Sequence, residues 1–165
     1  MWHVIYTKPR WEKKIYGKLL QKGYEVWCPM QKVERQWSDR KKVVEDVIFK
    51  SYLFAHITPA QRTYVLANEG VLNFVHFLGK PAIVRNEEIE TMKAYLMHQD
   101  AKITLQARDV FEANTKIRVR QGVFMDQKGK VIKAVGKKKV YVSLESFGHV
   151  MIVEFPSDHL QTMEE

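Results

Sequence analysis

The residues near the start of the chain with clear binding chemistry are lysines. Lys14, Lys18 and Lys22 recur every four residues, so in a helix they lie on one face. Lys8 and Arg10 come just before that helix. These five cations can neutralise phosphate groups without reading base sequence, which predicts a salt-dependent nucleic-acid-binding edge. A solvated helix face with no ligand explains the same spacing equally well.

A second basic segment surrounds an aromatic residue. Residues 31–42 are polar, and residues 37–39, Trp-Ser-Asp, are typical of a turn. Arg40 and Lys41 follow this turn directly. Cations beside an aromatic side chain can bind nucleic acid by pairing with phosphates and stacking on bases. A hairpin tip that carries ordinary solubilising charge is the alternative.

No set of residues indicates catalysis. The six histidines lack acidic or thiol partners at metal-ligand spacing. The lone Cys28 excludes an internal disulfide and a cysteine zinc cluster. No phosphate-binding glycine loop, nucleophile elbow or dinucleotide motif occurs. We therefore expect a protein that is not an enzyme and that uses no metal or cofactor.

The composition is that of a small, basic, globular protein. The chain has 165 residues, enough for one ordinary domain or two small ones, and a net charge of +8. Residues 1–50 carry 12 Lys and Arg against 6 Asp and Glu, so the excess lies mainly there. No apolar run is long enough to cross a membrane, and no signal peptide is evident. We expect a cytoplasmic protein without membrane contact.

Local patterns in the first part of the chain predict alternating strands and helices. A helix that has Pro9 in its first turn and stops at Gly23 carries the lysine face. A capping box at Thr58–Gln61 begins a second helix, and Asn86 caps a third. The β-branched and aromatic segments predict strands at 2–7, 25–30, 43–49, 52–57 and 71–77.

The pattern changes after residue 97. Residues 98–113 lose periodicity, and we interpret them as a linker with weak structure. From 114 to 165 only short β-type segments remain, separated by regularly spaced glycines. This predicts two domains, 1–97 and 114–165, of which the second is a small all-β barrel.

Four segments in order resemble the NusG family of transcription factors. Trp2–Arg10 resembles the first strand and helix start of the NusG N-terminal (NGN) domain. Phe49–Phe54 resembles its Phe-Pro-Gly/Asn-Tyr-hydrophobic-Phe segment, with Lys-Ser where Pro-Gly or Pro-Asn is usual. Residues 71–75 and 81–84, followed by an acidic helix, complete that domain. The resemblance implies an α+β fold, an α/β sandwich with a mostly antiparallel sheet.

The end of the chain resembles a KOW motif. Its key positions are Gly122, Phe124, Gly129 and Val131. The resemblance implies an SH3-like barrel that docks to ribosomal protein S10. In the RfaH protein of this family the same domain also folds as a helical hairpin. The strong β alternation here favours the barrel.

The resemblance implies binding to RNA polymerase. An aromatic-lined hollow of the NGN domain would dock on the clamp helices of the largest subunit, and aromatic anchors give a large contact area at low entropy cost. By motif position the hollow would involve Tyr6, Phe49 and Tyr52, together with Phe54 and Phe77. These aromatics could instead be ordinary core, and for Phe54 and Phe77 that interpretation is favoured.

The resemblance also implies two further contacts. Arg62 and Thr63 lie where a second polymerase contact, to the β-subunit gate loop, would fall. Lys8, Lys14 and Lys18 match the face that a specialised relative uses on the exposed non-template strand. Non-template or upstream DNA is therefore an expected partner.

Residues 31–46 and 81–84 are similar to the specialised UpxY-type regulators of capsular polysaccharide operons, and 81–84 also to RfaH. We expect a monomeric transcription elongation and antitermination factor that promotes processive elongation, of specific operons. The alternative is a KOW-containing RNA-binding or ribosome-associated module.

Overall fold

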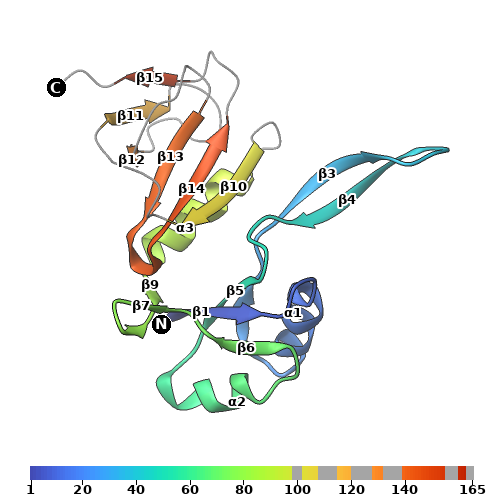
Figure 1. Ribbon diagram of the computed structural model, residues 1–165, viewed down its shortest axis with the longest axis vertical. Coiled ribbons are helices and arrows are strands. Elements are labelled where there is room, and N and C mark those ends of the chain that lie inside the picture. The colour runs from blue at the N-terminus through green and yellow to red at the C-terminus, as the bar shows by residue number, and fades with distance from the viewer. Residues whose placement is uncertain (98–101, 108–114, 120–127, 132–138, 155–159, 163–165) are drawn as a thin grey trace. The chain divides into compact units, whose positions relative to one another are not determined.

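The computed structural model describes residues 1–97, 102–107, 115–119, 128–131, 139–154 and 160–162. By its internal contacts the chain divides into the units Met1–Ile89 and Glu90–Glu165. Helices accompany antiparallel sheets (Figure 1). The predicted α+β class with mostly antiparallel strands is confirmed.

A five-stranded antiparallel sheet organises the first unit. β1 lies inside this sheet, which suits its nearly continuous burial. The strand order is β2 (Glu25–Trp27), β5 (Tyr52–His56), β1 (Trp2–Thr7) and β6 (Val71–Phe74), and β9 (Ile83–Val84) also pairs with β1.

Two helices cover one face of this sheet. α1 (Glu12–Gln21) contributes Ile15 and Leu19 to the core, and α2 (Arg62–Leu66) contributes Val65. The sheet contributes alternate residues, because successive side chains of a strand point to opposite faces. The sheet residues packed with these helices include Ile5, Val26, Leu53, Ala55 and Phe74.

α1 begins later than predicted. The backbone N–H of Trp11 donates to the carbonyl of Lys8 at 3.1 Å, which closes a turn before the helix. Pro9 occupies the second position of this turn, and Arg10 occupies the third at φ +66°. Proline followed by a positive φ is the signature of a type II turn. Pro9 therefore belongs to a turn, and placing it in the first helical turn was wrong.

Other helix ends agree more closely with the sequence patterns. Gly23 ends α1 at φ +80°, as predicted. A short 3-10 helix (Pro59–Gln61) precedes α2, and the backbone N–H of Thr58 donates to the Gln61 side chain at 2.8 Å, as expected of a capping box. α3 (Asn86–Leu96) is capped one residue earlier than predicted, because the Arg85 N–H donates to Glu88.

The bend before β5 is a tight turn even without Pro-Gly. The Tyr52 N–H donates to the Phe49 carbonyl at 3.0 Å, and Ser51 has φ +66°. Glycine and asparagine adopt this left-handed conformation most readily. Here contacts from other elements hold Ser51: its N–H donates to Glu12 Oε1 at 2.7 Å, and its carbonyl accepts the Thr7 N–H at 2.9 Å.

A long hairpin leaves the sheet between β2 and β5. β3 (Met30–Gln36) pairs with β4 (Lys41–Val47) along its whole length, and Figure 1 shows the hairpin extending away from the five-stranded sheet. The Trp37 N–H donates to the Arg40 carbonyl at 2.8 Å, so the predicted turn is confirmed. A much shorter hairpin joins β7 (His76–Phe77) and β8 (Lys80–Pro81).

The second unit contains a six-stranded antiparallel sheet. The 3-10 helix Glu145–Phe147 connects two of its strands. In sheet order the strands are β10 (Lys102–Ala107), β14 (His149–Glu154), β13 (Lys139–Leu144), β12 (Lys128–Val131), β11 (Thr115–Val119) and β15 (Leu160–Thr162).

β10 lies inside the segment interpreted as a weakly structured linker. For residues 102–107 that interpretation was wrong, since they pair with β14 throughout. Ile103 is buried, whereas Lys102 and Thr104 are exposed, so the segment has a strand alternation. The surrounding polar residues concealed this short signal.

Of the predicted KOW positions, Gly129 and Val131 lie on β12, paired with Ile117 and Thr115 of β11. Gly122 and Phe124 lie outside the described residues. The predicted small barrel at 114–165 also contains residues that the structure does not describe, so the barrel stays a prediction.

Candidate functional site

Two tyrosines form an open aromatic surface on the five-stranded sheet. Tyr6 of β1 and Tyr52 of β5 are register partners, and their ring centroids lie 5.7 Å apart. Tyr6 is 41% exposed and Tyr52 is half-buried. Burial, with the neighbouring Tyr6, raises the pKa of the Tyr52 phenol, so its hydroxyl stays neutral near pH 7. We call Tyr6 and Tyr52 the aromatic surface.

Buried aromatic rings lie next to Tyr52 in sequence and register. Phe54 shares its strand face, and Leu53 faces the helices, as predicted. Phe54 contacts Phe49 edge-on, with centroids 6.3 Å apart, and Trp27 at 5.2 Å. Phe49 and Phe54 are fully buried, so core packing is their role in this structure.

The other predicted polymerase-contact residues belong to elements other than β1 and β5, which carry the aromatic surface. Phe77 is half-buried on β7. Thr63 is exposed on α2, and the Arg62 guanidinium donates from Nε to His3 Nε2 at 3.2 Å. His3 and Tyr6 point to opposite faces of β1, since they are an odd number of residues apart. Arg62 therefore belongs to the helix-covered face.

His3 makes stability depend on pH. It is fully buried, and its Nδ1 lies 3.0 Å from the Met1 carbonyl. Because Arg62 donates to Nε2, the ring is neutral, with its proton on Nδ1. Burial lowers the pKa of His3 below its ordinary 6.5; the bond to Met1 opposes this shift, and the Arg62 charge adds to it.

We expect unfolding stability to fall as pH drops below about 6.5, because the unfolded chain then binds a proton that folded His3 resists. Above pH 6.5 the neutral ring makes its full contribution to the free energy of unfolding. That contribution decreases as the pH falls from 6.5 through the lower pKa of His3 in the folded protein. Urea unfolding between pH 5 and 8 measures this slope, and His3→Gln should flatten it. Equal slopes in the two proteins would contradict the assignment.

The predicted basic edge divides into residues with different partners. Lys14 and Lys8 lie over the Trp11 ring, with Nζ 3.9 and 5.4 Å from its centroid. Such cation–π contacts hold lysines close to an aromatic face. The Trp11 contribution was missed, although its position three residues from each lysine was a usable signal.

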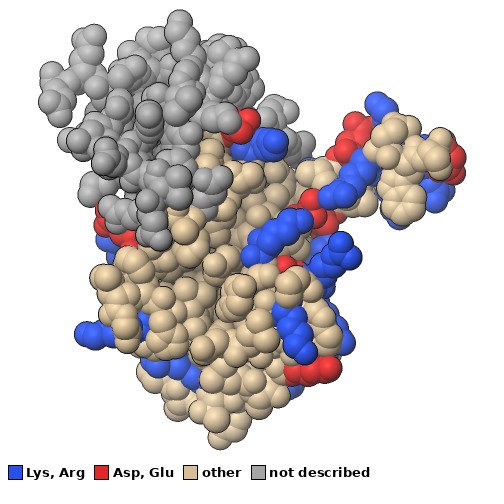
Figure 2. Space-filling model, in the orientation of Figure 1, with Lys and Arg blue, Asp and Glu red and all other residues tan. Residues whose placement is uncertain are grey.

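Lys18 of α1 and Lys22, which follows the helix, contact residues just before β6. Lys18 pairs with Glu69 at 3.8 Å, and the Lys22 ammonium donates to the Asn68 side chain. Figure 2 shows Lys and Arg side chains around α1 and at the base of the β3–β4 hairpin, with a few acidic side chains between them. Positive side chains therefore gather on this surface, and Glu69 reduces their net charge beside Lys18. Nucleic-acid binding by this edge stays a prediction.

The hairpin tip presents an exposed indole among cations. Trp37 is 51% exposed, and Lys42 Nζ lies 5.7 Å from its ring centroid. Arg40 is exposed, and Lys41 pairs with Glu34 at 3.8 Å. This geometry suits base stacking with phosphate pairing, as the sequence suggested.

The described residues offer little for bond-making chemistry. Burial and the nearby Glu12 charge raise the pKa of the Cys28 thiol to about 12, so it stays protonated. Within the described ranges, no three His, Cys, Asp or Glu side chains gather as a metal site would require. No described helix is long and apolar enough to cross a membrane.

Comparisons with known proteins point to one family. The family model described as "Transcription termination factor nusG" matches residues 1–93. The "Transcription termination/antitermination protein NusG" of Chlamydia trachomatis is 26% identical over 158 residues, covering 87% of this chain and 85% of the relative. The protein of the same name from Chlamydia pneumoniae is 25% identical over 125 residues, covering 73% of this chain and 67% of the relative. A solved structure of Thermotoga maritima NusG, 18% identical, matches with a TM-score of 0.50 and covers 99% of this chain and 97% of that one.

Proposed function

Because the chain belongs to the NusG family, we propose that it is a transcription elongation and antitermination factor that binds RNA polymerase. The observation that carries the proposal is the aromatic surface of Tyr6 and Tyr52, two accessible rings on the face of β1 and β5 opposite α1 and α2. An apolar helix tip needs such anchors, which give contact area at low entropy cost. The occupant we propose is the clamp-helix pair of the largest subunit.

The basic edge gives the bound factor a second contact. With the protein on the polymerase, Lys8 and Lys14 beside Trp11 would face upstream or non-template DNA. Lysine pairing with phosphate would add affinity without sequence readout. The resemblance of residues 31–46 to UpxY-type regulators supports service to specific operons, such as capsular polysaccharide operons.

The C-terminal part, proposed as a KOW domain at 114–165, would recruit a second partner such as ribosomal protein S10. Joining two binding modules in one chain raises the effective concentration of the second partner. In this proposal the protein acts as a monomer and by binding alone, without a catalytic step.

The direct test is complex formation between the full-length protein and core RNA polymerase. We expect co-elution in gel filtration, and shorter pauses with more readthrough at terminators during transcription in vitro. No association at micromolar concentrations, together with tight binding of polymerase-free RNA, would instead support the RNA-binding or ribosome-associated alternative.

A further inference from the structure

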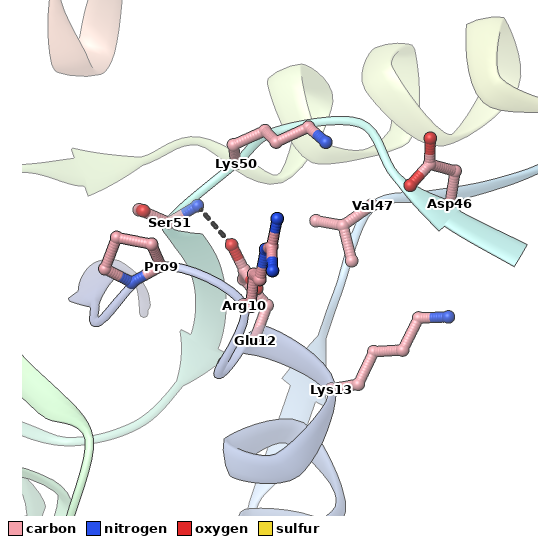
Figure 3. Close-up of a pocket in the computed structure, with 8 residues that line it drawn as sticks. All are labelled: Pro9, Arg10, Glu12, Lys13, Asp46, Val47, Lys50 and Ser51. Atoms are coloured by element: carbon pink, nitrogen blue, oxygen red, sulfur yellow. Dashed lines mark hydrogen bonds between the residues drawn. The ribbon is translucent and has the colours of Figure 1, made fainter.

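A polar pocket lies where three distant segments of the chain meet. The turn before α1, the end of β4 and the bend before β5 surround a space of about 460 Å³. Figure 3 shows its labelled side chains, and the nitrogen-bearing ends of Arg10 and Lys50 are turned toward the same space. Lys13 completes the set of three cations that line the pocket.

The two carboxylates in the pocket are already engaged by protein groups. Glu12 is buried and accepts the backbone N–H of Ser51 at 2.7 Å. Asp46 accepts a hydrogen bond from Arg35 Nη2, also at 2.7 Å. The lining therefore carries three cations against two carboxylates, and Asp46 also interacts electrostatically with Lys50.

Two tight turns hold Arg10 and Lys50 in place. Arg10 has φ +66° in the turn closed by Trp11 and Lys8, and Lys50 precedes Ser51, which has the same φ. Glu12 joins the two turns through its bond to Ser51. Cations on fixed backbone lose less freedom on binding, which favours a small anion.

The other two cations near the pocket already have partners. The Lys13 ammonium donates to the backbone carbonyl of Glu45 in β4, and Arg35 holds Asp46. Within the described residues, neither Arg10 nor Lys50 has a hydrogen bond or ion pair of its side chain. These two side chains are therefore the available anion ligands.

We propose that this pocket binds one phosphate group, held between the Arg10 guanidinium and the Lys50 ammonium. A guanidinium fork matches two phosphate oxygens, and an ammonium adds a point charge. The proposal deepens the proposed function and rests on its nucleic-acid-facing edge. A phosphate of a nucleic-acid backbone and a free phosphate ion share this chemistry.

The test uses the full-length protein without polymerase. Fluorescence anisotropy measures binding of a labelled 12-nucleotide single strand across a salt series for wild type, Arg10→Gln, Lys50→Gln and the double variant. Lys80→Gln, an exposed lysine on β8, is the control that removes the same charge elsewhere. Thermal unfolding of each variant checks that the fold is unchanged.

We expect each single substitution to weaken binding of the strand roughly 5- to 10-fold. The slope of log K against log salt concentration should become shallower by about 0.7, the value for one phosphate contact on a single strand. The double variant should bind the strand with nearly the same affinity as the single variant that binds less tightly, because both side chains hold the same phosphate. Lys80→Gln should stay within about twofold of wild type. Equal losses for Lys80→Gln and the pocket variants, or no loss in the double variant, overturn the proposal.

Inorganic phosphate distinguishes the two sources. If it displaces the strand from wild type better than chloride at equal ionic strength, and not from the double variant, the pocket takes free phosphate. If it displaces no better than chloride while the pocket variants bind weakly, the ligand is a backbone phosphate. Failure of wild type to co-elute with polymerase would overturn the proposed function and leave these binding results unchanged.

Discussion

Replacing Gly70 with alanine is expected to destabilise the protein by about 3 kcal/mol. Gly70 has φ +94°, a backbone conformation that L side chains rarely adopt. A Cβ here would overlap Trp11 Cε3 and lie 3.0 Å from Cδ2 of the same ring and 3.1 Å from Ile15 Cδ1. The Gly70 carbonyl also accepts the Lys8 N–H at 2.9 Å, so the backbone has little freedom to move away.

Gly79→Ala is the matched control for this prediction. Gly79 also has a positive φ, +76°, yet apart from its chain neighbours no heavy atom of the described residues lies within 4 Å of the position its Cβ would take. Gly79→Ala should therefore lower the free energy of unfolding by only about 1 kcal/mol, the cost of holding alanine at a positive φ. Urea unfolding of the two variants measures the difference, which reports the clash with Trp11. Equal losses would show that the Trp11 ring moves aside without penalty.

Replacing both Tyr6 and Tyr52 with alanine is expected to weaken polymerase binding about 100-fold, or roughly 2.8 kcal/mol. Both rings are accessible and contact each other, so they would present one continuous apolar area to a helix tip. Because neither ring is fully buried, the folded state should survive the change. Titration of labelled protein with core polymerase measures the affinity.

Leu72→Ala is the control for the tyrosine variant. Leu72 lies on the neighbouring strand β6 and is 48% exposed, close to the exposure of Tyr6. Its loss should leave polymerase affinity within about twofold of wild type. Phe49→Ala is a poor probe, since removing a fully buried phenylalanine would lower stability by about 3–5 kcal/mol. A folded tyrosine double variant with wild-type affinity would contradict the site.

Local sequence signals predicted much of the first unit. The apolar run of β1, the glycine stop at Gly23 and the Thr58–Gln61 capping box all act within a few residues of the chain. The strand, the helix end and the helix start that they form could therefore be predicted from neighbouring residues alone. The strand at 102–107 was missed because it is short and its partner, β14, lies more than forty residues later.

The candidate site was predictable in residue type and only partly in arrangement. The family resemblance singled out Tyr6 and Tyr52, and the register places their rings together. It also singled out Phe49, which proves fully buried. Burial depends on what packs over a side chain, and one strand pattern does not contain that information.

The sequence by itself determined the family, the strand faces and the location of the excess positive charge. Only the tertiary structure decided which cations are available. It pairs Lys18 with Glu69 and Lys14 with the Trp11 ring, and it places Arg10 and Lys50, forty residues apart in the chain, on the lining of one pocket. The physical reason is that the residue type alone gives a side chain its charge. Whether that charge has a partner depends on the distance to other side chains, and folding sets those distances.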